Sequence, residues 1–315
     1  MNAEAGEGVL SKVIGIKVDI DTSEGMKHGV PVLLALFKKY NIHASFFVPM
    51  GKDHTGWTVK RVFTRKGFIK KAGRVGVVST YGIKTLLYGI LLPGPEIAKK
   101  NAALLRRITE EGHELGIHGY DHVYWHDHIK YLGRDKTEDL LRRSVAVYSD
   151  ILHKNPESFA APGWMINAHA LKFFEDNGFI YTSNARGQIP FYPSLEGEAF
   201  HILELPSTLP TLDEVVGLAG TDVSSLTEFF LDALEEGLNI MTVHTELEGK
   251  RWIGFLDAFL RKSIEAGFVY KRLIEIAVEC KNLSTTKTCE MQYGSVEGRA
   301  GEVCVQKQLF TAIIP

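Results

Sequence analysis

The feature that most constrains the fold is an alternation of short, apolar, β-branched runs with stretches whose apolar residues recur at helical spacing. The first unit places a predicted strand at 13–20, a helix at 30–41 and a second strand at 44–49. Further predicted helices, each followed by an apolar run, are 96–114, 137–154, 170–179, 226–238 and 255–267. Such units predict parallel strands joined by crossover helices. We expect an α/β fold with about seven parallel strands, and favour a (β/α) barrel over an open sheet.

Length and composition fit one globular unit. A chain of 315 residues can hold one large or two modest domains, and its 45% hydrophobic and 23% charged residues are typical of a folded protein. We expect a tail over 1–12, a domain over 13–280, and an extension over 281–315 that packs on the domain. The net charge of -2 gives no general case for nucleic-acid binding, so an electrostatic partner would need a local patch.

Cysteine usage and the N-terminal sequence bear on the compartment. The three cysteines, Cys280, Cys289 and Cys304, are odd in number and form no CxxC pair. This disfavours a disulfide framework or a cysteine zinc site and fits a reducing compartment. Residues 1–12 lack the basic and apolar regions of a secretory signal, and no run of about 20 apolar residues indicates a transmembrane helix. We therefore expect a cytoplasmic protein.

The stretch from 54 to 95 differs from the rest of the chain because it contains no acidic residue. Aromatic residues are interleaved there with the basic residues Lys60, Arg61, Arg65, Lys66, Lys70, Lys71, Arg74 and Lys84. One interpretation is an insertion with a solvated basic face. Another is that 57–92 meets a membrane surface, with basic groups on anionic headgroups and apolar groups in the acyl boundary. Nucleic acid is the least favoured partner, because no recognised binding module accompanies the patch.

Two acids interrupt the first apolar run, which reads IKVDIDT at 16–22. The period-two spacing of Asp19 and Asp21 directs both side chains to one face of a strand. Two uncompensated carboxylates there would repel each other, and a divalent cation would remove the conflict. The alternative is an exposed strand end with two solvated acids.

A second cluster, GIHGYDHVYW, follows the predicted strand at 114–118. His118 and His122 are four residues apart, so a helix or tight turn after the strand would place them on one face at metal-chelating spacing. Two histidines and one aspartate would leave coordination positions open for water and substrate. Asp121 could orient a ligand, whereas we expect His126 and His128 to lie at the surface.

Two further features are weaker by themselves. The segment FAAPGW (159–164) places a Pro-Gly sequence at a predicted strand end, and it could be only a turn. His244 ends the apolar strand NIMTV, and a single strand-end histidine is weak evidence for a catalytic role, because a structural role is more common.

Taken together, these motifs resemble the NodB-homology polysaccharide deacetylases, which are metal-dependent amidases with a distorted (β/α) barrel. Within that family, the sequence is most similar to the deformylases of lipid A modification, which act on a formamido sugar carried by phosphoundecaprenol. The similar segments run over most of the chain and include KVDIDT, PGPEI, GIHGYDHVYW, YTSNARGQIPF, LPSTLPTLDEVVG, VHTELEG and GSVEGRAGEV. The LPTLDE and NARGQIPF segments are the more specific ones, because generic polysaccharide deacetylases lack them.

The resemblance implies a role for each site residue. One divalent metal ion is expected, Zn²⁺ first and Mn²⁺, Co²⁺ or Fe²⁺ as alternatives. Asp19 would be the general base and His244 the general acid that protonates the leaving amine. A backbone N–H in the turn of Gly163 and Trp164 would stabilise the oxyanion. The implied metal ligands are Asp21, His118 and His122.

Two positions depart from the family pattern. The family has an Arg that orients the base where this chain has Ala160, and we expect Arg186 to substitute for it. An Asp that supports the catalytic histidine is replaced by Asn184, which can accept a hydrogen bond but supplies no charge. We expect Asn184, Asp121 and Glu246 to surround the catalytic groups.

The function that the resemblance implies is removal of a formyl or acetyl group from an N-acyl amino sugar linked to a polyprenyl phosphate. The partners would then be a glycolipid substrate and a membrane surface, with the protein peripheral on the cytoplasmic face of the inner membrane. A soluble deacetylase of polysaccharide or another N-acyl compound is the alternative enzyme. A non-catalytic lipid-sugar binding homologue is a third, less favoured reading, prompted by Asn184.

Overall fold

The computed structural model describes residues 10–61, 83–283 and 286–307. Its main sheet has eight strands, and each pair of neighbouring strands is parallel. The order is β9-β1-β2-β3-β4-β5-β8, and β10 pairs with the first half of β1. The strands are β1 (Val13–Asp19), β2 (Ser45–Val48), β3 (Glu114–Ile117), β4 (Ser158–Ala160), β5 (Tyr181–Ser183), β8 (Leu203–Glu204), β9 (Leu238–His244) and β10 (Val269–Lys271).

Helices connect these strands, as the alternation in the sequence predicts. They are α1 (Val30–Tyr40), α5 (Ile83–Leu86), α6 (Ile97–Lys100), α7 (Ala102–Glu110), α8 (His122–His128), α9 (Arg134–Leu152), α10 (Ala168–Asp176), α11 (Leu212–Val215), α12 (Val223–Asp232), α13 (Ile253–Glu265) and α14 (Leu273–Asn282). Between β8 and β9 an irregular segment replaces strand pairing, and the N–H groups of Thr208 and Leu209 donate to the carbonyl of Ile240. This incomplete closure distorts the barrel, and the predicted fold class is confirmed.

Strand β1 pairs with three strands, β2, β9 and β10. All seven of its residues are buried, as expected for a parallel strand covered on both faces, which reads as a nearly continuous apolar run. Helix α1 follows it, begins with Pro31 in its first turn, and ends at Asn41, which adopts a left-handed conformation. Leu33, Leu34 and Phe37 are its buried core contacts. The carboxyl end of β1 lies at the edge of the sheet where sites form in this architecture.

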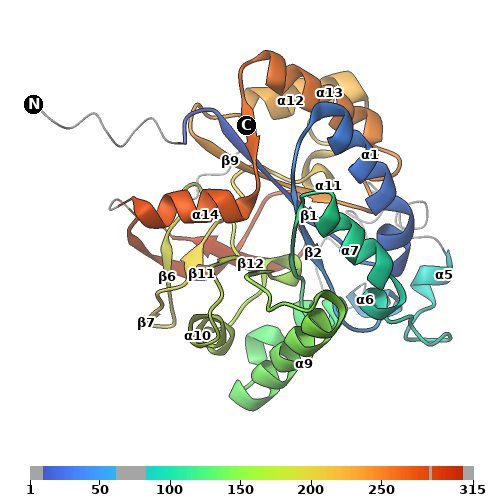
Figure 1. The fold of residues 1–315 in the computed structure, drawn as a ribbon, viewed down its shortest axis with the longest axis vertical. Coiled ribbons are helices and arrows are strands. Elements are labelled where there is room, and N and C mark those ends of the chain that lie inside the picture. The colour runs from blue at the N-terminus through green and yellow to red at the C-terminus, as the bar shows by residue number, and fades with distance from the viewer. Residues whose placement is uncertain (1–9, 62–82, 284–285, 308–315) are drawn as a thin grey trace, which may run out of the picture.

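A second, smaller sheet has the order β12-β11-β6-β7 and mixes parallel and antiparallel pairs. It lies beside α14 and α10, on the side of the molecule opposite α1 and α7 (Figure 1). The N–H of Arg186 donates to the carbonyl of Cys304, and the N–H of Gln306 donates to the carbonyl of Arg186, so β12 lies against the segment after β5. The strands are β6 (Tyr192–Leu195), β7 (Glu198–Ala199), β11 (Thr288–Ser295) and β12 (Glu302–Gln306).

The basic and aromatic stretch from 54 to 95 is described only at its two ends. A 3₁₀ turn (Thr55–Lys60) begins it, and α5 with the turn after it closes it. Five of the basic residues named above, Arg65, Lys66, Lys70, Lys71 and Arg74, lie outside the described residues. Within the described part of the chain, no helix has the length and apolar character needed to cross a membrane.

Candidate metal and catalytic site

The polar residues singled out in the sequence gather at the carboxyl ends of neighbouring strands. Asp19 is the last residue of β1 and is paired in register with His244, the last residue of β9. Asp21 follows β1, and His118 directly follows β3. Parallel strands end at the same edge of a sheet, so residues far apart in the sequence meet there.

Asp21, His118 and His122 form a group that could hold a metal ion, since one ligand atom from each lies within 4.8 Å of the others. Oδ1 of Asp21 is 3.2 Å from Nε2 of His122 and 3.5 Å from Nε2 of His118. This Oδ1 is buried and has no hydrogen-bond partner. An acceptor without a donor, facing two imidazole nitrogens, fits a divalent cation, which all three atoms could coordinate.

The orientation of His118 supports this interpretation. Its Nδ1 lies 2.8 Å from the carbonyl oxygen of Ala160. Because a carbonyl only accepts, Nδ1 carries the proton and donates, which leaves the lone pair of Nε2 directed toward Asp21. Metal-binding histidines are commonly fixed in this way by a hydrogen bond to the opposite nitrogen.

His122 reaches the site because a helix begins at it. The chain turns at Gly119, which has a φ of 79°, and therefore does not continue in the direction of β3. Asp121 then caps α8, and its Oδ1 accepts from the N–H of Tyr124 at 3.0 Å. As the sequence predicts, the turn brings the two imidazole rings of His118 and His122 together, with centroids 5.1 Å apart.

Glu246 holds the segment that carries Asp21. Its Oε1 accepts from the backbone N–H of Asp21 at 3.2 Å and from that of Thr22 at 2.9 Å. Burial, together with the charge of Asp21, raises the pKa of Glu246 to about 7. Burial also acts to raise the pKa of Asp21, but the charge of His122 and the nearby imidazole of His118 outweigh it and hold that pKa well below its usual value.

Lys17 is an important site residue that was not among the predicted ones. Its Nζ lies 3.3 Å from Oδ2 of Asp19, and both side chains are buried. The same Nζ donates to the carbonyl of Ser183 at 3.2 Å and lies 4.8 Å from the ring centre of Trp164. Burial lowers the pKa of Lys17, while the charge of Asp19 acts in the opposite direction. The spacing Lys-x-Asp in the sequence carried the signal, because it places Lys17 and Asp19 on one face of β1.

The contacts of Arg186 differ from the expectation that it substitutes for an arginine beside the base. Its Nη1 donates to both carboxylate oxygens of Glu214, at 2.7 and 2.9 Å, and its Nη2 donates to the carbonyl of Leu209 at 2.8 Å. Arg186 follows β5 and its guanidinium extends to α11, whereas Lys17 leaves β1 on the face that carries Asp19. The cation in contact with Asp19 is therefore Lys17.

Asn184 does not form the expected hydrogen bond with His244. The amide of Asn184 is buried without a hydrogen-bond partner, and Nδ1 of His244 has none either. The backbone N–H of His244 instead donates to Oε2 of Glu248 at 2.9 Å, and burial raises the pKa of that carboxyl to about 7. Burial acts to lower the pKa of His244, but nearby carboxylates outweigh it and raise that pKa. These carboxylates are Asp21, Asp213, Glu248 and Asp19.

The turn after β4 lies beside the metal ligands. Gly163 has a φ of 61°, and a Cβ at this position would come within 2.5 Å of the ring of His126. His126 is therefore buried against the turn, contrary to the expected surface position, whereas His128 is exposed as expected. The N–H of Trp164 donates to Ala161 at 3.0 Å, so an oxyanion donor in this turn would have to be another N–H.

An Asp–His–His set with a carboxylate and a histidine at the carboxyl ends of barrel strands is typical of metal-dependent hydrolases. The chain belongs to the polysaccharide deacetylase family, whose sequence profile matches residues 9–182. It is 32% identical over 264 residues to a probable 4-deoxy-4-formamido-L-arabinose-phosphoundecaprenol deformylase from Shewanella sediminis, covering 84% of this chain and 85% of the relative. A protein of the same description from Wigglesworthia glossinidia brevipalpis is 29% identical, with 90% and 99% covered.

Solved structures of this family share the fold. A probable polysaccharide deacetylase from Pseudomonas aeruginosa matches with a TM-score of 0.59 and 15% identity, covering 87% of this chain and 92% of that one. A CE4-family pseudoenzyme from Bacillus anthracis matches with a TM-score of 0.52 and 15% identity, covering 85% and 66%. The fold is thus shared with a probable deacetylase and with a pseudoenzyme, and function has to be argued from the site.

Proposed function

We propose that this protein is a metal-dependent amide hydrolase that removes the formyl group from an N-formyl amino sugar linked to a polyprenyl phosphate. The amide-hydrolase part follows from the family and from the residues at the strand ends. The formyl group and the lipid carrier are taken from the deformylases to which most of the chain is similar.

One arrangement carries the proposal. Asp21 presents an unpaired, buried Oδ1 to two histidines, and two residues earlier Asp19 presents an Oδ1 that is also buried and unpaired. The other oxygen of Asp19 is held by Lys17. A cation site beside a fixed carboxylate with one free oxygen is suited to activating a water molecule.

Each residue would then have a separate task. A divalent cation bound by Asp21, His118 and His122 would supply Lewis-acid chemistry and lower the pKa of a water molecule. Asp19 would accept the proton of that water through Oδ1, while Lys17 orients the carboxylate through its other oxygen. His244, whose pKa is raised, would donate a proton to the leaving amine nitrogen.

We also infer that the protein binds the membrane surface through the turn after α5, which lies at the C-terminal end of the basic and aromatic stretch. In the turn after α5, the side chains of Ile90, Leu91 and Leu92 are 52%, 75% and 37% exposed. Consecutive exposed apolar side chains next to a basic segment suit the boundary between headgroups and acyl chains. An enzyme acting on a polyprenyl-linked sugar needs such access, since its substrate does not leave the bilayer.

Mass spectrometry tests the proposal directly. A lipid-linked N-formyl amino sugar incubated with the metal-loaded protein should lose the mass of one carbonyl group, and the Asp19→Asn variant should leave it unchanged. The matching N-acetyl substrate and a water-soluble N-acetyl oligosaccharide should react far more slowly. Turnover of the soluble oligosaccharide alone would replace this proposal by a soluble deacetylase, and no turnover of any substrate would favour a binding protein.

A further inference from the structure

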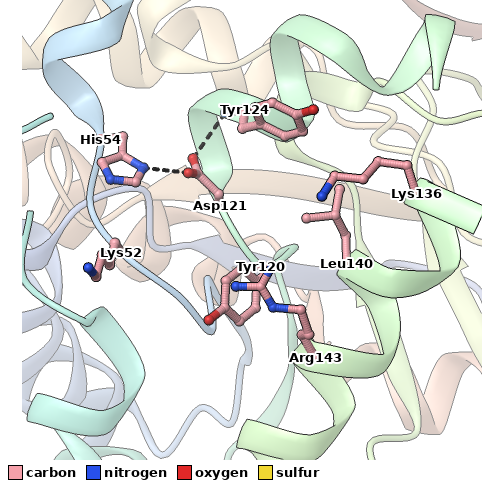
Figure 2. A pocket seen from close by; sticks show the side chains of 8 residues that line it. All are labelled: Lys52, His54, Tyr120, Asp121, Tyr124, Lys136, Leu140 and Arg143. Atoms are coloured by element: carbon pink, nitrogen blue, oxygen red, sulfur yellow. Dashed lines mark hydrogen bonds and ion pairs between the residues drawn. The ribbon is translucent and has the colours of Figure 1, made fainter.

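A cavity of about 320 Å³ lies outside the metal-binding group, between the segments that follow β2 and β3 and one face of α9 (Figure 2). Lys52 and His54 come from the first segment, Tyr120 and Asp121 from the second. Lys136 and Arg143 come from α9. The volume is within the range of small-molecule sites and is large enough for a phosphate group and part of a sugar.

The charges around this cavity favour an anion. Three cationic side chains line it, and Arg143 lies over the ring of Tyr120, with its guanidinium carbon 3.9 Å from the ring centre. Asp121 is the acid among the lining residues, but its oxygens are turned to Nδ1 of His54, 2.5 Å away, and to a backbone N–H of α8. The Asp121 carboxylate is therefore occupied by contacts within the cavity wall, while the cationic side chains remain available to bind an anion.

Asp139, also on α9, is an acidic residue close to two of these cations. It lies 3.5 Å from Nζ of Lys136 and 3.6 Å from Nη1 of Arg143, at distances too long for strong hydrogen bonds. Half of the Asp139 side chain is exposed, so these two ion pairs contribute little stability.

The cavity joins the metal-binding group to the exposed apolar turn. Asp121 directly precedes the ligand His122. On the other side, His54 stacks on Trp57 with ring centres 4.1 Å apart, and Nε1 of Trp57 donates to the carbonyl of Gly89 at 2.8 Å. The exposed side chains 90–92 follow Gly89 immediately. The metal-binding group, the cationic cavity and the apolar turn are thus connected in this order. A prenyl-phosphate sugar has the same order of parts, with the phosphate between the sugar and the prenyl chain.

We propose that this cavity binds the phosphate group of the lipid-linked substrate, with Lys52, Lys136 and Arg143 as its cationic contacts. This inference rests on the proposed function and deepens it, because it names the part of the substrate that fixes specificity. The sugar would then extend toward the metal ligands, and the prenyl chain would leave past the apolar turn.

Binding can be measured without turnover. Isothermal titration calorimetry with citronellyl phosphate, a short and water-soluble prenyl phosphate, should detect binding to metal-free and metal-loaded protein. The double variant Lys136→Gln/Arg143→Gln should weaken it by about tenfold or more, and Lys52→Gln by less. The control Arg142→Gln changes a neighbouring exposed residue that pairs with Glu138 outside the cavity, and it should bind as the wild type does. Inorganic phosphate should bind more weakly than citronellyl phosphate, and equal binding would indicate a site for free phosphate.

Kinetics give a second arm. For a prenyl phosphodiester of an N-formyl amino sugar, the double variant should raise KM by about tenfold and leave kcat near the wild-type value. For the neutral alkyl glycoside of the same sugar, neither parameter should change. Unaltered citronellyl phosphate binding in the double variant would overturn the inference even if deformylation is observed. Charge-dependent binding with no deformylation would instead uphold the cavity and overturn the proposed function.

Discussion

Nζ of Lys17 lies 3.3 Å from Oδ2 of Asp19, and the two side chains are 0% and 4% exposed. The second oxygen of Asp19 has no hydrogen-bond partner. A buried ion pair of this kind gives little net stability, because the loss of hydration offsets most of the attraction. Its value here is that it fixes one oxygen of the proposed base and leaves the other free.

Replacing Lys17 should therefore affect both stability and catalysis. In Lys17→Met, Asp19 is left buried and unpaired, and we expect the free energy of unfolding to fall by about 3–5 kcal/mol. We expect kcat to fall by about 10²-fold with little change in KM, because the base loses its orientation. Urea denaturation and steady-state kinetics on the formylated substrate measure the two effects.

The Lys17→Arg variant separates charge from shape. It keeps the cation beside Asp19 and should recover part of the lost kcat, although the larger guanidinium does not fit the same space. A Lys17→Met protein that is destabilised but retains wild-type kcat would assign Lys17 a purely structural role.

The two acids after β1 should respond differently to mutation. Asp21→Ala removes one of the three proposed ligands, so metal content after dialysis should fall strongly. Asp19→Asn keeps the ligand set, so it should retain metal and lose turnover by about 10²–10⁴-fold. Elemental analysis alongside the deformylation assay distinguishes them, and equal metal loss in both variants would mean that Asp19 is itself a ligand.

Stability should fall on acidification because of His113, which lies away from the metal ligands. Its Nδ1 accepts from the N–H of Ala44 at 3.0 Å, and burial, with a smaller contribution from His43, lowers the pKa of His113 from 6.5 to about 4. As the pH falls below 6.5, the unfolded chain binds a proton that the folded chain does not. This contribution to the free energy of unfolding is fully present above pH 6.5 and is lost as the pH falls from 6.5 to 4. The total loss is about 3 kcal/mol.

Urea denaturation between pH 7 and pH 4 measures this loss. His113→Gln should flatten the pH dependence of the free energy of unfolding relative to the wild type. His43→Gln changes an exposed histidine and should have a much smaller effect. Identical slopes for the wild type and His113→Gln would show that His113 titrates normally.

Membrane association should depend on the turn after α5. Replacing Ile90, Leu91 and Leu92 by Ser removes exposed apolar area, and co-sedimentation with anionic vesicles should decrease by about tenfold. Replacing Leu218 and Val278, which are 48% and 49% exposed elsewhere on the surface, provides the control. Equal loss of binding in both variants would indicate a nonspecific effect of surface hydrophobicity.

Much of the site could be predicted because its signals are local. Period-two spacing predicted that Asp19 and Asp21 lie on one side of the chain, and the structure places them at the end of β1 and just after it. The four-residue spacing of His118 and His122 suggested chelation. The sequence of helices and strands predicted a parallel sheet, and carboxyl ends of parallel strands meet at one edge. Lys17 carried the same local signal, since it lies two residues before Asp19, but a lysine in an apolar strand gains meaning only when its burial is known.

Contacts between distant segments were decided by the tertiary structure. Arg186 binds Glu214 because α11 lies within reach of the segment after β5, and nothing in the sequence around Arg186 encodes that proximity. Asn184 follows β5 and His244 ends β9, two strands that do not pair with each other, and the two side chains form no hydrogen bond. Lys52 and Arg143 line the same cavity only because α9 packs beside the segments that follow β2 and β3. The sequence by itself determined the chemistry available at each strand end, and the packing of helices on the sheet determined which of those groups face one another.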